Sequence, residues 1–169
     1  MSPNNYTERN FEEHIEVQLQ NSGYIKVDKK LYDKSLCLIP SQLIEFIQET
    51  QPKKYKKLTE QYGGDTNTKL TKRISEQIES KGVVELLRKG VQDRGSHFDL
   101  VYFQPKSGLN PKHQDLYKKN RFIEVRQVYY SNRNENSIDM GIFINGIPIM
   151  MLELKNSLTG QNHTHGIKQ

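Results

Sequence analysis

The chain has 169 residues, a length that fits one domain with a buried core. Hydrophobic residues make up 34% of it, and no apolar run reaches the roughly 20 residues of a membrane helix, so a membrane-spanning chain is excluded. The single cysteine, Cys37, excludes an intrachain disulfide framework, and the net charge of +5 suits a polyanionic partner. We expect a cytoplasmic protein.

The first half of the chain is predicted to be mostly helical. Phe11, Ile15 and Leu19 recur at helical spacing, which predicts an amphipathic helix over residues 7–19 with Thr7 as its cap. Further helices are expected over residues 41–48 (with Ser41 as cap), 52–62, 67–80 and 83–88.

After Gly95 the pattern changes to strand. We predict strands over residues 97–103 and 121–128, with a short helix between them that begins after Asn110-Pro111. Two more strands flank Asn145-Gly146, which is the strongest short-range hairpin signal. The predicted fold class is therefore α/β (α+β): a mixed sheet flanked by helices, with an α-rich N-terminal half, in a single domain over residues 1–169.

Three charged residues at the outer ends of this hairpin are candidates for a metal-dependent catalytic site. Asp139 lies in the first strand, and the second strand ends with Glu153 and Lys155, which share one face because strand side chains alternate. Two carboxylates can hold Mg²⁺, which prefers oxygen ligands, and the ammonium group can position a water beside it. The competing interpretation is a solvent-facing hairpin edge, where Glu and Lys two residues apart are common.

The spacing of these residues makes a demand on the hairpin. A plain two-residue turn pairs Ile144 with Ile147 and sets Asp139 opposite Leu152, on the face away from Glu153. A one-residue offset, from a three-residue loop or a β-bulge, brings the three charges onto one face. We therefore predict an irregularity between Asp139 and Glu153.

Several blocks in colinear order, spread over nearly the whole chain, carry a family resemblance. They are FEEHI (11–15), CLIP (37–40), FIQETQP (46–52), LRKG (87–90) with DRG (93–95), SGLNP (107–111), NRF (120–122), SIDM (137–140), FINGIP (143–148) and LELKNSLTGQ (152–161). The chain resembles the N-terminal endonuclease domain of the restriction (R) subunit of type I restriction–modification enzymes. This resemblance implies a restriction-endonuclease-like fold with a PD-(D/E)xK nuclease core.

In that core, the resemblance implies that Asp139 and Glu153 bind Mg²⁺ and that Lys155 acts beside them in catalysis. The backbone carbonyl of Leu154 is a candidate third ligand. Glu12 or Glu13, on the first helix, is a tentative further ligand, with a solvated helix face as the competing interpretation. Gln169 matches the glutamine of a glutamine–tyrosine pair that the family carries beyond the lysine.

The implied function is a type I site-specific deoxyribonuclease that cleaves unmodified double-stranded DNA in a complex with methyltransferase and specificity subunits. No G-x-x-x-x-G-K-[ST] motif occurs, so we expect an N-terminal fragment without the translocase motor, and ATP binding only by the full-length subunit. Two alternatives stay open: a noncatalytic docking or DNA-binding module, and a free-standing repair-type nuclease.

Overall fold

The computed structural model describes residues 8–107, 110–129 and 136–154. The helices of this part are α1 (Glu8–Asn21), α2 (Pro40–Thr50), α3 (Pro52–Tyr62), α4 (Thr66–Lys81), α5 (Val83–Lys89) and α6 (Pro111–Lys118), with 3-10 turns at Lys29–Leu31 and Gly63–Asp65. The strands are β1 (Ile25–Lys26), β2 (Val91–Asp93), β3 (Ser96–Phe98), β4 (Phe122–Tyr129), β5 (Ser137–Ile144) and β6 (Ile147–Leu152).

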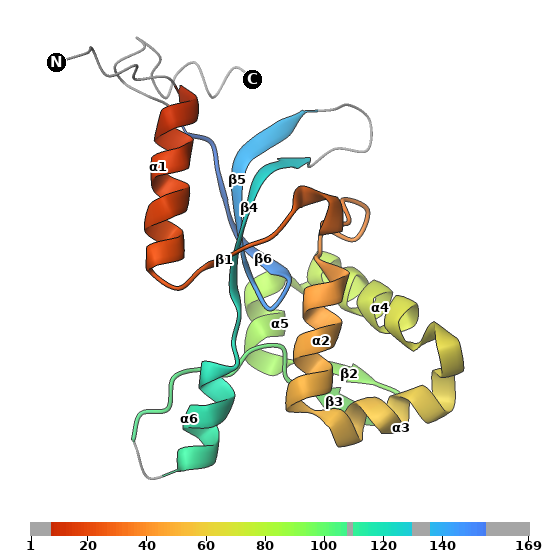
Figure 1. Ribbon diagram of the computed structural model, residues 1–169. Coiled ribbons are helices and arrows are strands. Elements are labelled where there is room, and N and C mark those ends of the chain that lie inside the picture. Colours follow the sequence, from red (N-terminus) through yellow and green to blue (C-terminus); the bar gives the residue numbers. More distant parts are fainter. Residues whose placement is uncertain (1–7, 108–109, 130–135, 155–169) are drawn as a thin grey trace, which may run out of the picture.

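The larger sheet has the strand order β1-β4-β5-β6, and a smaller sheet pairs β2 with β3. β1 runs parallel to β4, whereas the β4–β5 and β5–β6 pairs are antiparallel, so the sheet is mixed. Figure 1 shows α1 alongside the larger sheet, while α2 to α5 gather around the smaller one. The predicted α/β fold class is confirmed, including its α-rich N-terminal half.

Two apolar clusters form the core. The first lies among α2 to α5 and the small sheet and is built on side chains such as Phe46, Leu70 and Phe98, with Ile147 from the hairpin. The second packs against the larger sheet and includes Val125 and Phe143. The hairpin therefore contributes to both clusters and ties the helical part of the molecule to its main sheet.

The Asn145-Gly146 turn is held by its backbone conformation, by side-chain hydrogen bonds and by close packing. Both residues have positive φ, 52° and 84°, as a two-residue type I′ hairpin turn requires. The buried Asn145 side chain accepts the Arg121 N–H at 2.7 Å and donates to the Leu100 carbonyl at 2.9 Å. A Cβ on Gly146 would lie 2.5 Å from the Ile39 carbonyl oxygen, so only glycine fits against the start of α2.

Most predicted helices are found within two residues of their expected ends. The cap expected at Ser41 is wrong, because α2 already begins at Pro40, a residue whose fixed φ and missing N–H suit the first helical position. Thr7 lies outside the described residues. The two- and three-residue strands β1 and β2 were not predicted, since so few residues show no periodicity.

The buried face of α1 is not the predicted apolar one. Phe11 is exposed and Ile15 and Leu19 are only half-buried, whereas Glu12 and Glu16 are 7% and 6% exposed. Basic side chains on the sheet attract this acidic face, as described below. The hydrophobic periodicity of α1 thus predicted a helix correctly but the wrong face.

The strand predicted over residues 97–103 is correct only at its start, because β3 ends at Phe98. Beyond it, side-chain amides replace a neighbouring strand. Gln51 bonds both the N–H and the carbonyl of Asp99, at 2.9 and 2.8 Å, and Asn120 does the same for Tyr102, at 3.1 and 2.6 Å. The backbone N–H and carbonyl groups of Asp99 and Tyr102 are therefore hydrogen-bonded although this segment does not belong to a sheet.

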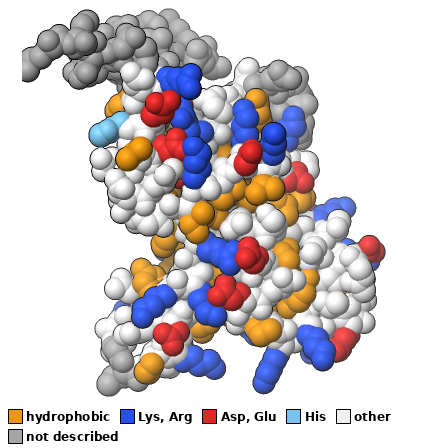
Figure 2. Space-filling view, viewed as in Figure 1, with side chains coloured by type: hydrophobic (Ala, Val, Ile, Leu, Met, Phe, Trp, Pro, Cys, Tyr) orange, Lys and Arg blue, Asp and Glu red, His pale blue; other side chains and the backbone are white. Residues whose placement is uncertain are grey.

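The surface is polar and of mixed charge. On the face shown in Figure 2, Lys and Arg side chains are interspersed with Asp and Glu side chains. A mixed pattern of this kind does not by itself mark a nucleic-acid surface on that face. None of the described helices combines the length and the apolar character that crossing a membrane requires.

Candidate active site

The β5–β6 hairpin contains the predicted irregularity. Next to the turn, Ile144 pairs with Ile147 and Phe143 with Pro148, but Ile142 then pairs with Met150, so Ile149 is an extra residue in β6. This is the one-residue offset of a β-bulge. A bulge, and not a three-residue loop, therefore shifts the outer half of the hairpin.

The bulge changes which residues face Asp139. The pairing continues through Gly141 with Met151 to Met140 with Leu152, where β6 ends. When the same register is extended by one position, Asp139 lies across from Glu153. Facing positions of an antiparallel pair lie on the same side of a sheet. A carboxylate from each strand thus comes to one face at the outer end of the hairpin.

A hydrogen bond anchors the first of these acids. The backbone N–H of Leu154 donates to Oδ2 of Asp139 at 2.6 Å. Asp139 is half-buried and Glu153 is exposed, so the pair lies where solvent and a large substrate have access. Lys155 and Gln169, predicted to complete the site, lie outside the described residues.

The donor set suits a hard cation. Mg²⁺ is usually held by one or two carboxylates, with waters and substrate phosphate oxygens completing the shell. Within residues 8–107, 110–129 and 136–154, no three His, Cys, Asp or Glu side chains are placed to hold an ion together. Two carboxylates such as Asp139 and Glu153 are a usual protein contribution to a Mg²⁺ site.

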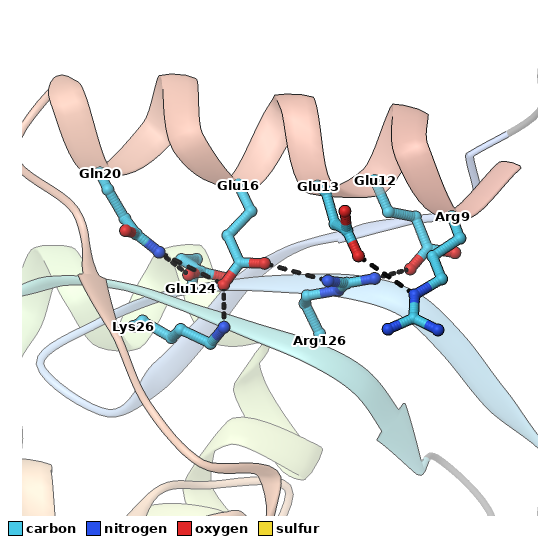
Figure 3. Close-up of polar contacts among 8 residues, drawn as sticks. All are labelled: Arg9, Glu12, Glu13, Glu16, Gln20, Lys26, Glu124 and Arg126. Carbon is cyan, nitrogen blue, oxygen red and sulfur yellow. Dashed lines mark hydrogen bonds and ion pairs between the residues drawn. The ribbon is translucent and has the colours of Figure 1, made fainter. Parts of the chain in front are cut away.

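A largely buried ionic cluster lies between α1 and β4 (Figure 3). The Arg126 guanidinium binds Glu12 at 2.6 Å and Glu16 at 3.0 Å. Burial lowers the pKa of Arg126, but the two carboxylates outweigh it and raise that pKa above its ordinary value. The tentative ligand Glu12 is thus already engaged by a cation of the sheet.

The second tentative ligand from α1 lies in a different environment. Glu13 pairs with Arg9 one helical turn earlier, at 3.1 Å, and both side chains are largely exposed. Figure 3 shows this pair at the edge of the cluster. An exposed ion pair one turn apart along a helix is the solvated helix face that the sequence left open as the alternative.

Farther along the same interface lies Glu124, which is fully buried. Gln20 donates a hydrogen bond to its Oε1 at 3.2 Å, whereas its Oε2 has no partner among the described residues. Burial raises the pKa of Glu124, and the nearby negative charge of Glu16 adds to this effect. Burial also raises the pKa of Glu16, but bonds from Lys26 and Arg126 outweigh it and bring that pKa below its ordinary value.

This cluster was not predicted, although the sequence contains a signal for it. Glu12, Glu16 and Gln20 recur every four residues on one face of α1, and Glu124 and Arg126 alternate on β4. Each pattern is typical of a solvated surface when it is considered alone. Only the docking of one element onto the other makes it a buried interface.

Comparison with known proteins agrees with the resemblance described above. The family model of the type I restriction enzyme R protein N terminus matches residues 5–169. No curated protein and no solved structure matches the chain. Because the family match covers nearly all of the sequence, including both acids of the hairpin, the chain belongs to the family of type I restriction enzyme R protein N termini.

Proposed function

We propose that this chain is the metal-dependent endonuclease domain of a type I restriction enzyme and hydrolyses phosphodiester bonds of unmodified double-stranded DNA. The observation that carries the proposal is the bulge at Ile149, which sets Asp139 across from Glu153 in a member of the R protein N-terminus family. β-bulges are over-represented next to active sites, where they change the direction of a side chain. The proposed setting is a cytoplasmic complex with methyltransferase and specificity subunits, driven by ATP bound elsewhere in the subunit.

Each residue has a distinct role in this proposal. Asp139 and Glu153 hold Mg²⁺, with the Leu154 carbonyl as a further ligand, and the Leu154 N–H fixes the direction of the Asp139 carboxylate. When bound, the ion would supply Lewis-acid activation of the phosphodiester and of a water molecule. Lys155 orients that water through its ammonium group and offsets the negative charge that builds up on the phosphate.

The glutamates of α1 are left out of the proposed metal site. Glu12 is buried and held by Arg126, and Glu13 is paired with Arg9 at the surface. A carboxylate that neutralises a buried guanidinium cannot leave it without exposing an unpaired charge. We assign Glu12 to holding α1 on the sheet, and Gln169 remains a prediction from the resemblance.

The test is DNA cleavage by the reconstituted restriction complex carrying Asp139→Ala or Lys155→Ala. We expect cleavage to fall about 100–1,000-fold in each, as for the loss of one preorganised electrostatic group, while ATP hydrolysis persists. Asp115→Ala and Lys106→Ala, which alter exposed residues away from the hairpin, are the matched controls and should cut normally. Unchanged cleavage by the Asp139 variant would favour the docking module.

Two further measurements separate the remaining alternatives. Mn²⁺ titration of the full chain should perturb signals near Asp139 and Glu153, and Asp139→Ala should remove the effect. Cleavage that needs neither ATP nor the methyltransferase subunits would identify a free-standing nuclease instead. The titration and the cleavage assay are both made on the wild-type protein, and only the Asp139→Ala comparison requires a folded variant.

A further inference from the structure

One residue of β4 has a backbone conformation that strands do not use. Gln127 has φ +53°, in the left-handed region. Among the described residues, three other non-glycine residues share a positive φ, and each of them lies in a turn: Cys37, Arg94 and Asn145. Gln127 alone among these four lies inside a strand, where a left-handed residue costs free energy and persists only if its surroundings impose it.

Gln127 interrupts the main sheet at a specific place. The ladder between β4 and β5 runs from Phe122 to Arg126 and resumes at Val128, and the residue across from Gln127 by position is Asp139. The side-chain alternation also breaks here. Val125 and Val128, three residues apart, pack in the same apolar cluster, although strict alternation would put them on opposite faces.

The strand that contains Asp139, β5, therefore pairs with an irregular strand on each side. On the β6 side, the extra residue Ile149 shifts the register, and on the β4 side, Gln127 opens the ladder. The Gln127 side chain is itself held, because the Ser137 hydroxyl donates to its Oε1 at 2.9 Å from two residues before Asp139. The distortion at Gln127 lies directly across from the residue to which the Leu154 N–H is directed, and the bulge at Ile149 sets the register of that residue on the β6 side.

We propose that Gln127 is a positioning residue for Asp139. Its left-handed backbone interrupts the β4–β5 ladder opposite that residue, and this sets the direction in which the Asp139 carboxylate meets the Leu154 N–H. The effect on metal binding rests on the function proposed above, whereas the effect on the Asp139–Leu154 hydrogen bond does not. If the strain served only the twist of the long strands, replacing Gln127 would change stability but leave that bond intact.

The experiment compares substitutions that differ in their tolerance of positive φ. Gln127→Gly and Gln127→Asn accept the left-handed conformation, whereas the β-branched Gln127→Val strongly disfavours it. Gln127→Ala takes the place of the valine variant if the latter does not fold. Gln92→Val, at an exposed position of β2 with an ordinary backbone, is the control for introducing valine into a strand.

Two signals are measured on the full chain, namely the NMR shift and hydrogen exchange of the Leu154 amide, and the affinity for Mn²⁺. We expect Gln127→Val to shift that amide, to speed its exchange and to weaken Mn²⁺ binding about 10–100-fold, as the loss of an outer support of a metal ligand does. The glycine and asparagine variants should behave as wild type in both signals.

Each outcome decides the inference. A Leu154 amide that is unchanged in a folded Gln127→Val or Gln127→Ala protein overturns it, whatever the thermal stability. Equal losses in the glycine, asparagine and valine variants would also overturn it, because they would implicate the glutamine side chain and not its backbone. If wild-type protein binds no Mn²⁺, the proposed function fails, and the Leu154 amide alone decides the role of Gln127.

Discussion

Replacing Arg126 with methionine tests whether the ionic cluster holds α1 on the sheet. The guanidinium neutralises Glu12 and Glu16, whose side chains are both buried. Methionine keeps much of the arginine stem volume but removes the charge and both hydrogen-bond donors. The substitution therefore leaves two buried carboxylates without this partner.

The expected cost follows from what each carboxylate retains. Removing one partner of a buried ion pair typically costs about 3–5 kcal/mol. Glu16 keeps its bonds from Lys26 and Gln20, and water reaches the edge of Arg126, so the lower end applies, at about 3 kcal/mol. For a domain of this size, that corresponds to a fall of about 6–12 °C in Tm.

The assay is urea unfolding of wild type and Arg126→Met at several pH values. The pKa of Glu16 lies below its ordinary value of 4.5, so its stabilising contribution is present above pH 4.5 and is lost as the pH falls through the folded-state pKa. The difference between the two proteins should therefore shrink in acid. Arg9→Met, which breaks the exposed pair with Glu13, is the matched control and should cost less than about 1 kcal/mol.

A cost for Arg126→Met that is as small as that of the control would show that the ionic cluster does not hold α1 on the sheet. So would a cost that stays constant from pH 7 down into the acid range, because it would reflect packing and not charge. In either case α1 would be held by its half-buried apolar side chains, and Glu12 would be available for another role.

Other changes give equally direct outcomes. Glu124→Gln should raise the urea unfolding midpoint at pH 7 and lose this advantage below pH 4.5. Burial raises the pKa of Glu124, so ionisation of this side chain opposes folding once the pH rises above 4.5, its ordinary pKa. Gly146→Ala should cost about 2–4 kcal/mol in urea unfolding, from its positive φ and the contact with the Ile39 carbonyl, whereas Gly64→Ala, with open space around it, should be nearly neutral. Gln51→Ala should destabilise by about 1–3 kcal/mol, since it leaves the backbone groups of Asp99 without their partner, and hydrogen exchange should localise the effect there.

The hairpin was predictable because its signals are local. Asn145-Gly146 fixes the turn, and the demand that Asp139 and Glu153 share a face predicts an irregular register. The position of the irregularity was not predicted, although Pro148 gave a hint. A residue without an N–H is tolerated mainly in edge strands and bulges, and it lies directly before the extra residue Ile149.

The errors share a different physical origin. Beyond Phe98, the segment expected as a strand over residues 97–103 has side-chain amides of Gln51 and Asn120 as backbone partners, and these come from other parts of the chain. The apolar stripe of α1 was expected to be buried, but the buried side chain is Glu12, which binds Arg126. This partner lies 114 residues away in the sequence, so no local pattern predicts it. Local patterns gave the type of the helices and of the longer strands, whereas these partners depend on tertiary docking.

The extra residue in β6 makes the hairpin unusually sensitive to its length. Loss of the single codon for Ile149 would leave the turn, the apolar character of both strands and every charged residue in place. It would nevertheless slide the outer half of the strand by one position, turning Glu153 to the opposite side from Asp139. Across relatives of this chain, substitutions in β6 should therefore be tolerated far more readily than changes in the number of residues between Gly146 and Glu153.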